Sequence, residues 1–316
     1  MAFIFTYIKL LTKKFNTMVN RRDFLKQASL LMAGGVIGSS ILSSCSSGGS
    51  KAAAAEASKK HIGLQLYSLR DDVNELGIQK VLEIVAGMGY VNLEAANYND
   101  GTFYGFAPRE FKKMVDDLGM KITSSHVGRQ LSDNRDEDMT WWSKATEAHA
   151  SAGMRYMIMP WSPLDGESAT SDNVKRYADY FNAIGLITAA ASITFGYHNH
   201  AFEFKNKIDG IPLYDLLLEN TSPNHVIFQN DVYWTRVGGY DPVEYMKKYP
   251  KRIKVLHIKD EKAIGASGAV DFKAIFDQAY ANNVKDWYVE VEDYDGTPQE
   301  DVKKSYDFLA AAEFVK

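Results

Sequence analysis

The chain has 316 residues, of which 46% are hydrophobic, and its 36 Lys and Arg against 40 Asp and Glu give a formal net charge of −4. An acidic protein without a basic stripe is a poor candidate for binding nucleic acid, so we expect no nucleic-acid partner. Cys45 is the only cysteine, which excludes an intramolecular disulfide and a cysteine nucleophile in the chain that follows it.

The N-terminal segment has the pattern of an export signal. Residues 20–26 contain an arginine pair typical of a twin-arginine signal, and residues 28–42 follow as a weakly apolar stretch that is too short to span a bilayer. The stretch ends in Leu-Ser-Ser-Cys45, which resembles a bacterial lipobox. We therefore expect residues 1–45 to be the signal region, with translation starting at Met18. The mature protein would be a periplasmic lipoprotein anchored at Cys45.

The next segment predicts a tether. Residues 46–60 consist mainly of Ser, Gly, Ala and Lys, a composition typical of flexible linkers. Contact with the membrane is then expected only through the lipid. Residues 61–316 match the size of one eight-fold β/α barrel, roughly 250 residues. We expect a single catalytic domain there.

This domain alternates between apolar runs of strand length and helical patterns. The predicted strands occupy residues 62–67, 90–94, 121–126, 155–160, 193–200, 226–231, 253–259 and 287–292, and clear helical patterns occupy 77–88, 108–118, 137–151 and 172–190. Eight β/α units in a row predict an α/β fold, a closed parallel (β/α)8 TIM barrel. No G-x-G-x-x-G follows the first strand, so a dinucleotide-binding sheet lacks its usual mark.

The last four predicted strands all end in residues that can bind metal. They carry, in order, His198 and His200, Asp231, His257, and Glu290 and Glu292. In a parallel barrel these ends meet at one mouth. Two histidines, an aspartate and a glutamate converging there would suit one divalent cation, with Mn²⁺, Co²⁺, Zn²⁺ and Fe²⁺ all compatible. Periodicity does not decide between Glu290 and Glu292, because they share a face.

Other residues near strand ends are candidate contacts for a substrate: Gln65, Tyr67, Glu94, His126 and Trp234. Trp234 is equally compatible with packing above the barrel core. Lys259 shares a face with His257. Asp260, Glu261 and Asp293 fall in predicted loops and are expected to be solvated.

Five motifs resemble one known family: Gly63-Leu-Gln-Leu-Tyr-Ser-Leu-Arg70, Tyr197-His-Asn-His200, Asp231-Val-Tyr-Trp234, His257-Ile-Lys-Asp260 and Val289-Glu290. With them, residues 62–316 resemble the xylose-isomerase-like TIM-barrel superfamily of sugar phosphate isomerases and epimerases, in a branch of exported or lipid-anchored proteins. The resemblance implies a divalent ion held by a Glu-Asp-His-Glu set from the fifth to eighth strands.

Three of these ligand positions match Asp231, His257 and Glu290, whereas His198 stands where the family has Glu. Glu203, further along, is the alternative fourth ligand. Simple epimerases of the family use two carboxylates on opposite faces of the sugar carbon, and here only one is plainly in place.

The expected activity is metal-dependent removal of a proton next to a carbonyl on a non-phosphorylated carbohydrate. The catalytic candidates are Glu203, His200, Lys259 and Glu290, with Lys259 supplying positive charge to the developing oxyanion or a proton to a leaving group. The family favours isomerisation or epimerisation, and this is the activity we expect, with a lyase or hydratase as the alternative. The histidine at position 198 and the exported address favour a lyase or hydratase acting on 3-keto sugars or 3-keto-glycosides. A non-catalytic, lipid-anchored sugar-binding protein is the alternative from another class.

Overall fold

The computed structural model of the protein describes residues 60–316. The expected signal region, Met18, Cys45 and nearly all of the tether therefore lie outside the described residues. Within the described part, eight parallel strands close into a barrel in the order β1-β12-β11-β10-β7-β6-β5-β2. The predicted (β/α)8 TIM barrel is confirmed.

The barrel strands coincide with the predicted runs. They are β1 (Gly63–Gln65), β2 (Asn92–Ala95), β5 (Lys121–His126), β6 (Tyr156–Met159), β7 (Thr194–His198), β10 (Val226–Asp231), β11 (Ile253–Lys259) and β12 (Asp286–Glu290). β7 and β12 stop two residues before the predicted ends, so His200 and Glu292 lie in the loops that follow.

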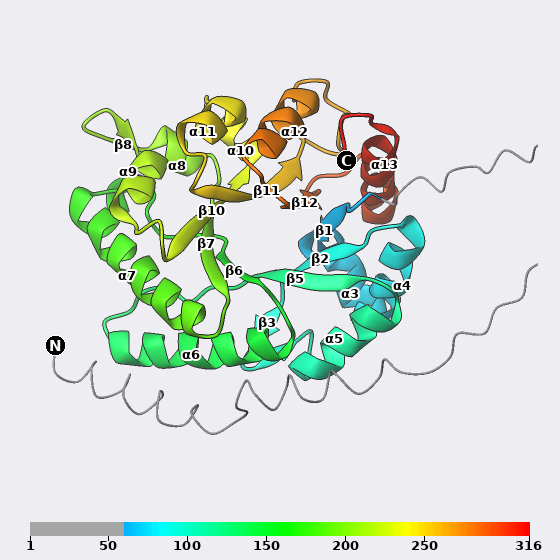
Figure 1. Cartoon of the computed structure of the whole chain (residues 1–316), viewed down its shortest axis with the longest axis horizontal. Helices are drawn as coiled ribbons and strands as arrows, with labels where there is room; N and C mark the ends of the chain where they lie inside the picture. The colour runs from blue at the N-terminus through cyan, green and yellow to red at the C-terminus, as the bar shows by residue number, and fades with distance from the viewer. Residues whose placement is uncertain (1–59) are drawn as a thin grey trace, which may run out of the picture. The chain divides into compact units, whose positions relative to one another are not determined.

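The helices surround the strands, as Figure 1 shows. They are α3 (Arg70–Leu76), α4 (Ile78–Met88), α5 (Pro108–Asp117), α6 (Arg135–Ser151), α7 (Ser171–Ala190), α8 (Phe202–Lys205), α9 (Leu213–Asn220), α10 (Val232–Val237), α11 (Pro242–Lys248), α12 (Phe272–Ala281) and α13 (Pro298–Ala311). Short 3-10 turns η1 (Leu66–Leu69) and η2 (Gly166–Ser168) and two hairpins, β3 (Tyr98–Asn99) with β4 (Thr102–Phe103) and β8 (Lys207–Ile208) with β9 (Ile211–Pro212), complete the elements.

Strand register makes candidate site residues direct neighbours across adjacent strands. Asp231 pairs with His257 between β10 and β11, and Lys259 pairs with Glu290 between β11 and β12. The register of β10 against β11 shifts between Phe228 and Gln229, immediately before the strand end. Such an irregularity re-aims the side chains that follow it.

Polar and aromatic groups fill the opposite, N-terminal end of the barrel lumen. The hydroxyls of Thr123 and Tyr288 lie 2.7 Å apart. Asp286 accepts hydrogen bonds from Tyr156 Oη at 2.9 Å and from Arg155 Nη2 at 2.6 Å. The lumen is thus packed at this end, and any opening to a site in the barrel lies at the C-terminal ends of the strands.

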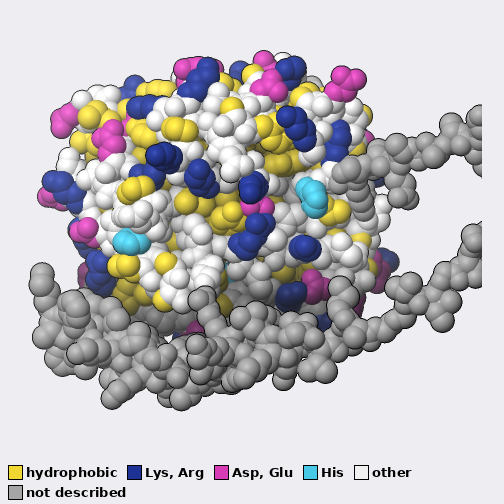
Figure 2. Space-filling model, viewed as in Figure 1, with side chains coloured by type: hydrophobic (Ala, Val, Ile, Leu, Met, Phe, Trp, Pro, Cys, Tyr) yellow, Lys and Arg dark blue, Asp and Glu magenta, His cyan; other side chains and the backbone are white. Residues whose placement is uncertain are grey.

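The surface of the described part mixes both signs of charge. On the face drawn in Figure 2, basic and acidic side chains alternate with apolar ones. Between residues 60 and 316, no helix has both the length and the apolar character needed to cross a bilayer.

Candidate active site

Four side chains from adjacent strands form a group that could hold a metal ion. His198, Asp231, His257 and Glu290 each offer one ligand atom, and these atoms all lie within 4.8 Å of one another. All four side chains are buried. The residues come from β7, β10, β11 and β12, so the structure brings together the four candidates that the strand ends suggest.

Asp231 supplies the observation that fits a cation. Its Oδ1 accepts a hydrogen bond from the backbone N of Trp234 at 2.7 Å and so caps α10. Its buried Oδ2 has no hydrogen-bond partner among residues 60–316. Burial raises the pKa of Asp231 to about 8, although Lys259 opposes the shift. A buried carboxylate oxygen without a partner is costly, and a bound cation would remove that cost.

His257 lies between two carboxylates. Its Nδ1 is 3.1 Å from Glu290 Oε2, and its Nε2 is 2.5 Å from Glu94 Oε2. Although burial by itself lowers it, Glu290 and Glu94 raise the pKa of His257 to about 10. Burial also opposes ionisation of Glu290, but His257 and Lys259 hold the pKa of Glu290 well below its usual range. A positive charge beside Glu290 is therefore built into the site.

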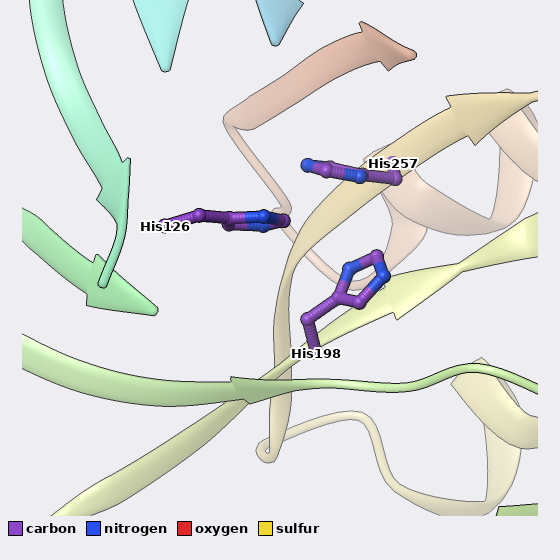
Figure 3. A group of neighbouring side chains, drawn as sticks. All are labelled: His126, His198 and His257. Carbon is purple, nitrogen blue, oxygen red and sulfur yellow. The ribbon is translucent and has the colours of Figure 1, made fainter. Parts of the chain in front are cut away.

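Glu94 and Gln229 lie beneath the histidines. Glu94 is buried and accepts hydrogen bonds from Gln65 Nε2 at 2.8 Å, Ser124 Oγ at 2.6 Å and Gln229 Nε2 at 2.9 Å. Gln229 Oε1 lies 2.7 Å from His126 Nε2 and 3.1 Å from His198 Nδ1. Figure 3 shows the three histidine rings that converge here from separate strands.

The sequence does not single out Gln229, although it shares a face of β10 with Asp231. Gln65 and Glu94, which we expected among the substrate contacts, are fully buried and bonded to each other below the group. They do not line the cleft described below.

Lys259 pairs with the second glutamate of the β12 end. Its Nζ lies 2.7 Å from Glu292 Oε2 and 3.8 Å from Glu290 Oε2. Nζ also lies 5.7 Å from the ring centre of Trp234. The structure thus separates the two glutamates that periodicity leaves equivalent: Glu290 joins the ligand group and Glu292 holds Lys259.

His200 and Glu203 have different surroundings. The ring of His200 lies 5.0 Å from that of His198, and its buried Nδ1 has no hydrogen-bond partner among residues 60–316. Burial lowers the pKa of His200 to about 4. Glu203 accepts hydrogen bonds from Tyr197 Oη at 2.7 Å and from the backbone N of His200 at 2.8 Å. The short helix α8 therefore directs Glu203 away from the mouth, where the sequence suggested it, and outside the ligand group.

A cleft of about 400 Å³ opens above the group. It is lined by Tyr67, Ala96, Tyr98, His126, Val127, Gly128, Pro160, Trp161, His198, His200, Glu290 and Glu292. Tyr67 and Trp161 are 41% and 45% exposed, which is unusual for such large aromatic side chains. The guanidinium of Arg70 lies 4.7 Å from the ring centre of Tyr67 and donates a hydrogen bond to Tyr294 Oη at 2.8 Å. The sequence does not single out Trp161.

The prediction that Asp260 is a solvated charge is wrong. It is buried and accepts hydrogen bonds from the backbone N of Glu261 at 2.8 Å and of Gly265 at 3.0 Å. It shapes the loop after β11, because these bonds satisfy backbone groups that would otherwise be unpaired.

Comparison with known proteins identifies the relatives of this barrel. The family model described as xylose isomerase-like TIM barrel matches residues 81–312. Among solved structures, a sugar phosphate isomerase/epimerase from Parabacteroides distasonis ATCC 8503 is 41% identical with a TM-score of 0.75, covering 81% of this chain and 100% of that one. A second such protein from the same organism is 38% identical with a TM-score of 0.76, covering 84% and 99%.

Curated relatives carry another activity. An inosose dehydratase from Geobacillus kaustophilus is 26% identical over 211 residues, covering 61% of this chain and 66% of that protein. One from Clostridium tetani is 25% identical over 141 residues, covering 37% and 46%. The matches span about two thirds or less of the length of these relatives. A structure of the IolI protein with a bound zinc atom has a TM-score of 0.63 at 14% identity, covering 81% of this chain and 98% of that one, and shares the fold.

Proposed function

This chain belongs to the xylose isomerase-like TIM-barrel family, and on that premise we propose that it is a metal-dependent lyase of the dehydratase or hydratase type. Its substrate would be a non-phosphorylated keto sugar or keto-glycoside, from which it removes the proton next to the carbonyl. The observation that carries the proposal is the buried His198–Asp231–His257–Glu290 group beside a cleft. The family resemblance implies a glutamate at the position of His198.

Two carboxylates and two imidazoles suit a transition-metal ion better than Mg²⁺, so we propose Mn²⁺, Co²⁺, Zn²⁺ or Fe²⁺. Such an ion, when bound, would polarise the substrate carbonyl and stabilise the negative charge that develops as the α-proton leaves.

The chain's own residues supply the proton transfers in this proposal. His200 lines the cleft as a neutral imidazole with an unpartnered Nδ1, so it is a candidate to accept the α-proton. Lys259 Nζ, held by Glu292, is the candidate to donate a proton to the leaving oxygen. The C–H and C–O bonds break, a C=C bond forms, and the leaving group departs with the donated proton. We assign Glu203 the role of holding the His200 loop rather than a step in the reaction.

The lining of the cleft supports an uncharged carbohydrate. Tyr67 and Trp161 offer exposed aromatic faces on which the apolar faces of sugar rings can pack. Glu290 and Glu292 line the cleft, no Lys or Arg among the described residues does, and Lys259 behind them is already paired with Glu292, so a phosphate group would meet like charge. Export and anchoring at Cys45 remain part of our proposal, and that site lies outside the described residues.

The proposal is tested on the full chain prepared without chelator. Elemental analysis is expected to find about one metal per chain in the wild type and a loss of metal in a Asp231→Ala/His257→Ala double variant. Keto sugars and keto-glycosides in deuterated water are then followed by NMR. An unsaturated or hydrated product indicates a lyase or hydratase. Absence of metal after incubation with Mn²⁺, Co²⁺ or Zn²⁺ contradicts the mechanism.

A second candidate function is isomerisation or epimerisation. The 41% identical Parabacteroides distasonis protein, described as a sugar phosphate isomerase/epimerase, favours it. The same NMR experiment separates the two, because an epimerase places deuterium at the α-carbon and retains every C–O bond. Binding of sugar with neither exchange nor elimination would instead indicate a sugar-binding protein.

A further inference from the structure

Glu94 is a buried carboxylate that can only accept hydrogen bonds. Gln65 Oε1 accepts a hydrogen bond from the backbone N of Tyr67 at 3.1 Å, so Gln65 Nε2 is the atom that faces Glu94. Ser124 Oγ donates to the other oxygen, Oε1. A carboxylate surrounded by donors has no hydrogen of its own to offer. Every neighbour within hydrogen-bond distance must therefore present one to Glu94.

This requirement fixes the orientation of the Gln229 amide. One end of the Gln229 amide lies 2.9 Å from Glu94 Oε1, and only the amide nitrogen, Nε2, can donate a hydrogen bond there. Gln229 Oε1 therefore points to the opposite side, towards the histidines. The orientation follows from the partners, and so does not depend on telling amide oxygen from nitrogen by position.

The amide oxygen in turn fixes the hydrogens of two histidines. Gln229 Oε1 lies 2.7 Å from His126 Nε2 and 3.1 Å from His198 Nδ1, and an oxygen of this type only accepts. Both nitrogens therefore carry hydrogen. A neutral imidazole has one hydrogen, so His198 presents the lone pair of Nε2.

His257 is set directly by Glu94. Its Nε2 lies against Glu94 Oε2 and must donate, so Nδ1, which directs its hydrogen to Glu290 in the metal-free protein, is the nitrogen that would be free to bind a metal once that hydrogen is displaced. The same assignment decides between two overlapping groups of potential ligands. His126, His198 and His257 also form such a group, but the Nε2 atoms of His126 and His257 direct their hydrogens to Gln229 and Glu94. The group with Asp231 and Glu290 is favoured.

We propose that Glu94 and Gln229 are positioning residues that select the nitrogen each histidine presents, Nε2 for His198 and Nδ1 for His257. The consequence for metal binding rests on the proposed function, whereas the hydrogen positions do not. Polar partners behind metal-binding histidines typically change metal affinity about 10–100-fold when they are removed. Gln229 would then turn Nε2 of His198 towards the other three ligands.

The test uses the metal-free full chain labelled with ¹⁵N in histidine. Two-bond ¹H–¹⁵N correlation spectra distinguish an imidazole protonated on Nδ1 from one protonated on Nε2. We expect His198 to carry its hydrogen on Nδ1. A wild-type spectrum with the hydrogen on Nε2 overturns the proposal, whatever the variants do.

Variants then test the link to the metal. Gln229→Met keeps the side-chain length and removes the acceptor, and we expect mixed protonation of His198 and about 10–100-fold weaker binding of Zn²⁺ in competition with a chelator. Gln65→Met is the matched control, because it removes the other amide donor to Glu94 but contacts no histidine. Equal effects of both variants, or unchanged affinity in Gln229→Met, overturn the positioning role.

A third variant separates this inference from the proposed function. If Asp231→Asn retains wild-type affinity for Zn²⁺, or if the wild type binds no metal, the proposed function fails. The wild-type protonation pattern is still measured in that case and decides the role of Glu94 and Gln229 by itself.

Discussion

At the scale of single residues, the charge of the ligand group follows from His198. Two carboxylates and two imidazoles carry one negative charge fewer than the Glu-Asp-His-Glu set that the family resemblance implies. Within this group, Asp231 destabilises the metal-free protein, because its Oδ2 is buried without a hydrogen-bond partner among the described residues. A residue retained in spite of such a cost is typical of a site that trades stability for function.

Asp231→Asn is therefore expected to lose metal binding and to raise the stability of the metal-free protein by about 1–3 kcal/mol, because a neutral amide takes the place of an acid whose ionised form burial opposes. Urea unfolding of the metal-free protein measures this. Asp215→Asn is the matched control. Asp215 is also buried, but it accepts hydrogen bonds from Tyr249 Oη at 2.8 Å and Tyr245 Oη at 3.2 Å. The control is expected to destabilise, and stabilisation by both variants would contradict the argument.

His149, outside the ligand group, makes the stability of the protein depend on pH. Burial lowers the pKa of His149 to about 4, although its hydrogen bond to the Ala145 carbonyl opposes the shift. As the pH falls, His149 binds a proton near pH 6.5 in the unfolded chain, but only near pH 4 in the folded chain. The stability contribution is complete above pH 6.5 and is lost as the pH falls towards 4, with about 2 kcal/mol lost between pH 7 and pH 5.

His149→Gln is expected to reduce this loss between pH 7 and pH 5, as measured by urea unfolding of the metal-free protein at the two pH values. His61→Gln, at an exposed position, serves as the control and is expected to leave the loss unchanged. If His149→Gln keeps the full pH dependence, proton uptake by this histidine is not its source.

At the scale of elements, two helical glycines have opposite surroundings. A Cβ added at Gly185 in α7 would lie 2.1 Å from the backbone O of His225, so this glycine allows the helix to approach the chain before β10. A Cβ at Gly87 in α4 would meet no described atom within 4 Å. The same substitution therefore has opposite consequences in the two helices.

Gly185→Ala is expected to destabilise the protein by about 2 kcal/mol or more, because overpacking outweighs the gain in helix propensity. Gly87→Ala is expected to stabilise it by about 0.5–1 kcal/mol. Thermal unfolding of the two variants provides the comparison. A stabilised Gly185→Ala would show that α7 can move away from His225 without loss.

The elements also show what the sequence could predict. Apolar period and glycine or proline punctuation place α5 at Pro108 and end α4 before Gly89, whose φ of 107° suits glycine. Sequence periodicity cannot predict the two hairpins, because a two-residue strand is too short to show a period. It cannot predict the role of Gln229 either, because that role depends on hydrogen bonds to three residues of other strands. Tertiary contacts also explain why Glu203 turns away, since its partners, Tyr197 and the His200 backbone, are not defined by period.

At the scale of the whole molecule, we propose that the barrel works at a membrane surface. The supporting pattern is the lipobox-like Leu-Ser-Ser-Cys45 after an apolar stretch, which lies outside the described residues. A lipid carried on Cys45 would retain the protein without a spanning helix.

Cys45→Ala is therefore expected to prevent lipidation of the protein and to move it from the membrane fraction to the soluble fraction when the full chain is expressed in a bacterium. Labelling with a radioactive fatty acid followed by fractionation measures both effects. An unlabelled wild-type protein would exclude the anchor, whereas Ser44→Ala, next to it, should retain the label.

The plugged lower end of the lumen has a kinetic consequence. The barrel below the ligand group is filled by side chains, namely Thr123, Tyr156, Asp286 and Tyr288. A substrate and its products would therefore enter and leave through the same opening at the C-terminal ends of the strands. In an elimination that yields two molecules, the one nearer the mouth must depart before the one held deeper. Release is then ordered, and the deeper product, as the last to leave, competes with incoming substrate for the empty enzyme. A barrel closed at one end thus predicts that the product released last inhibits competitively with respect to substrate.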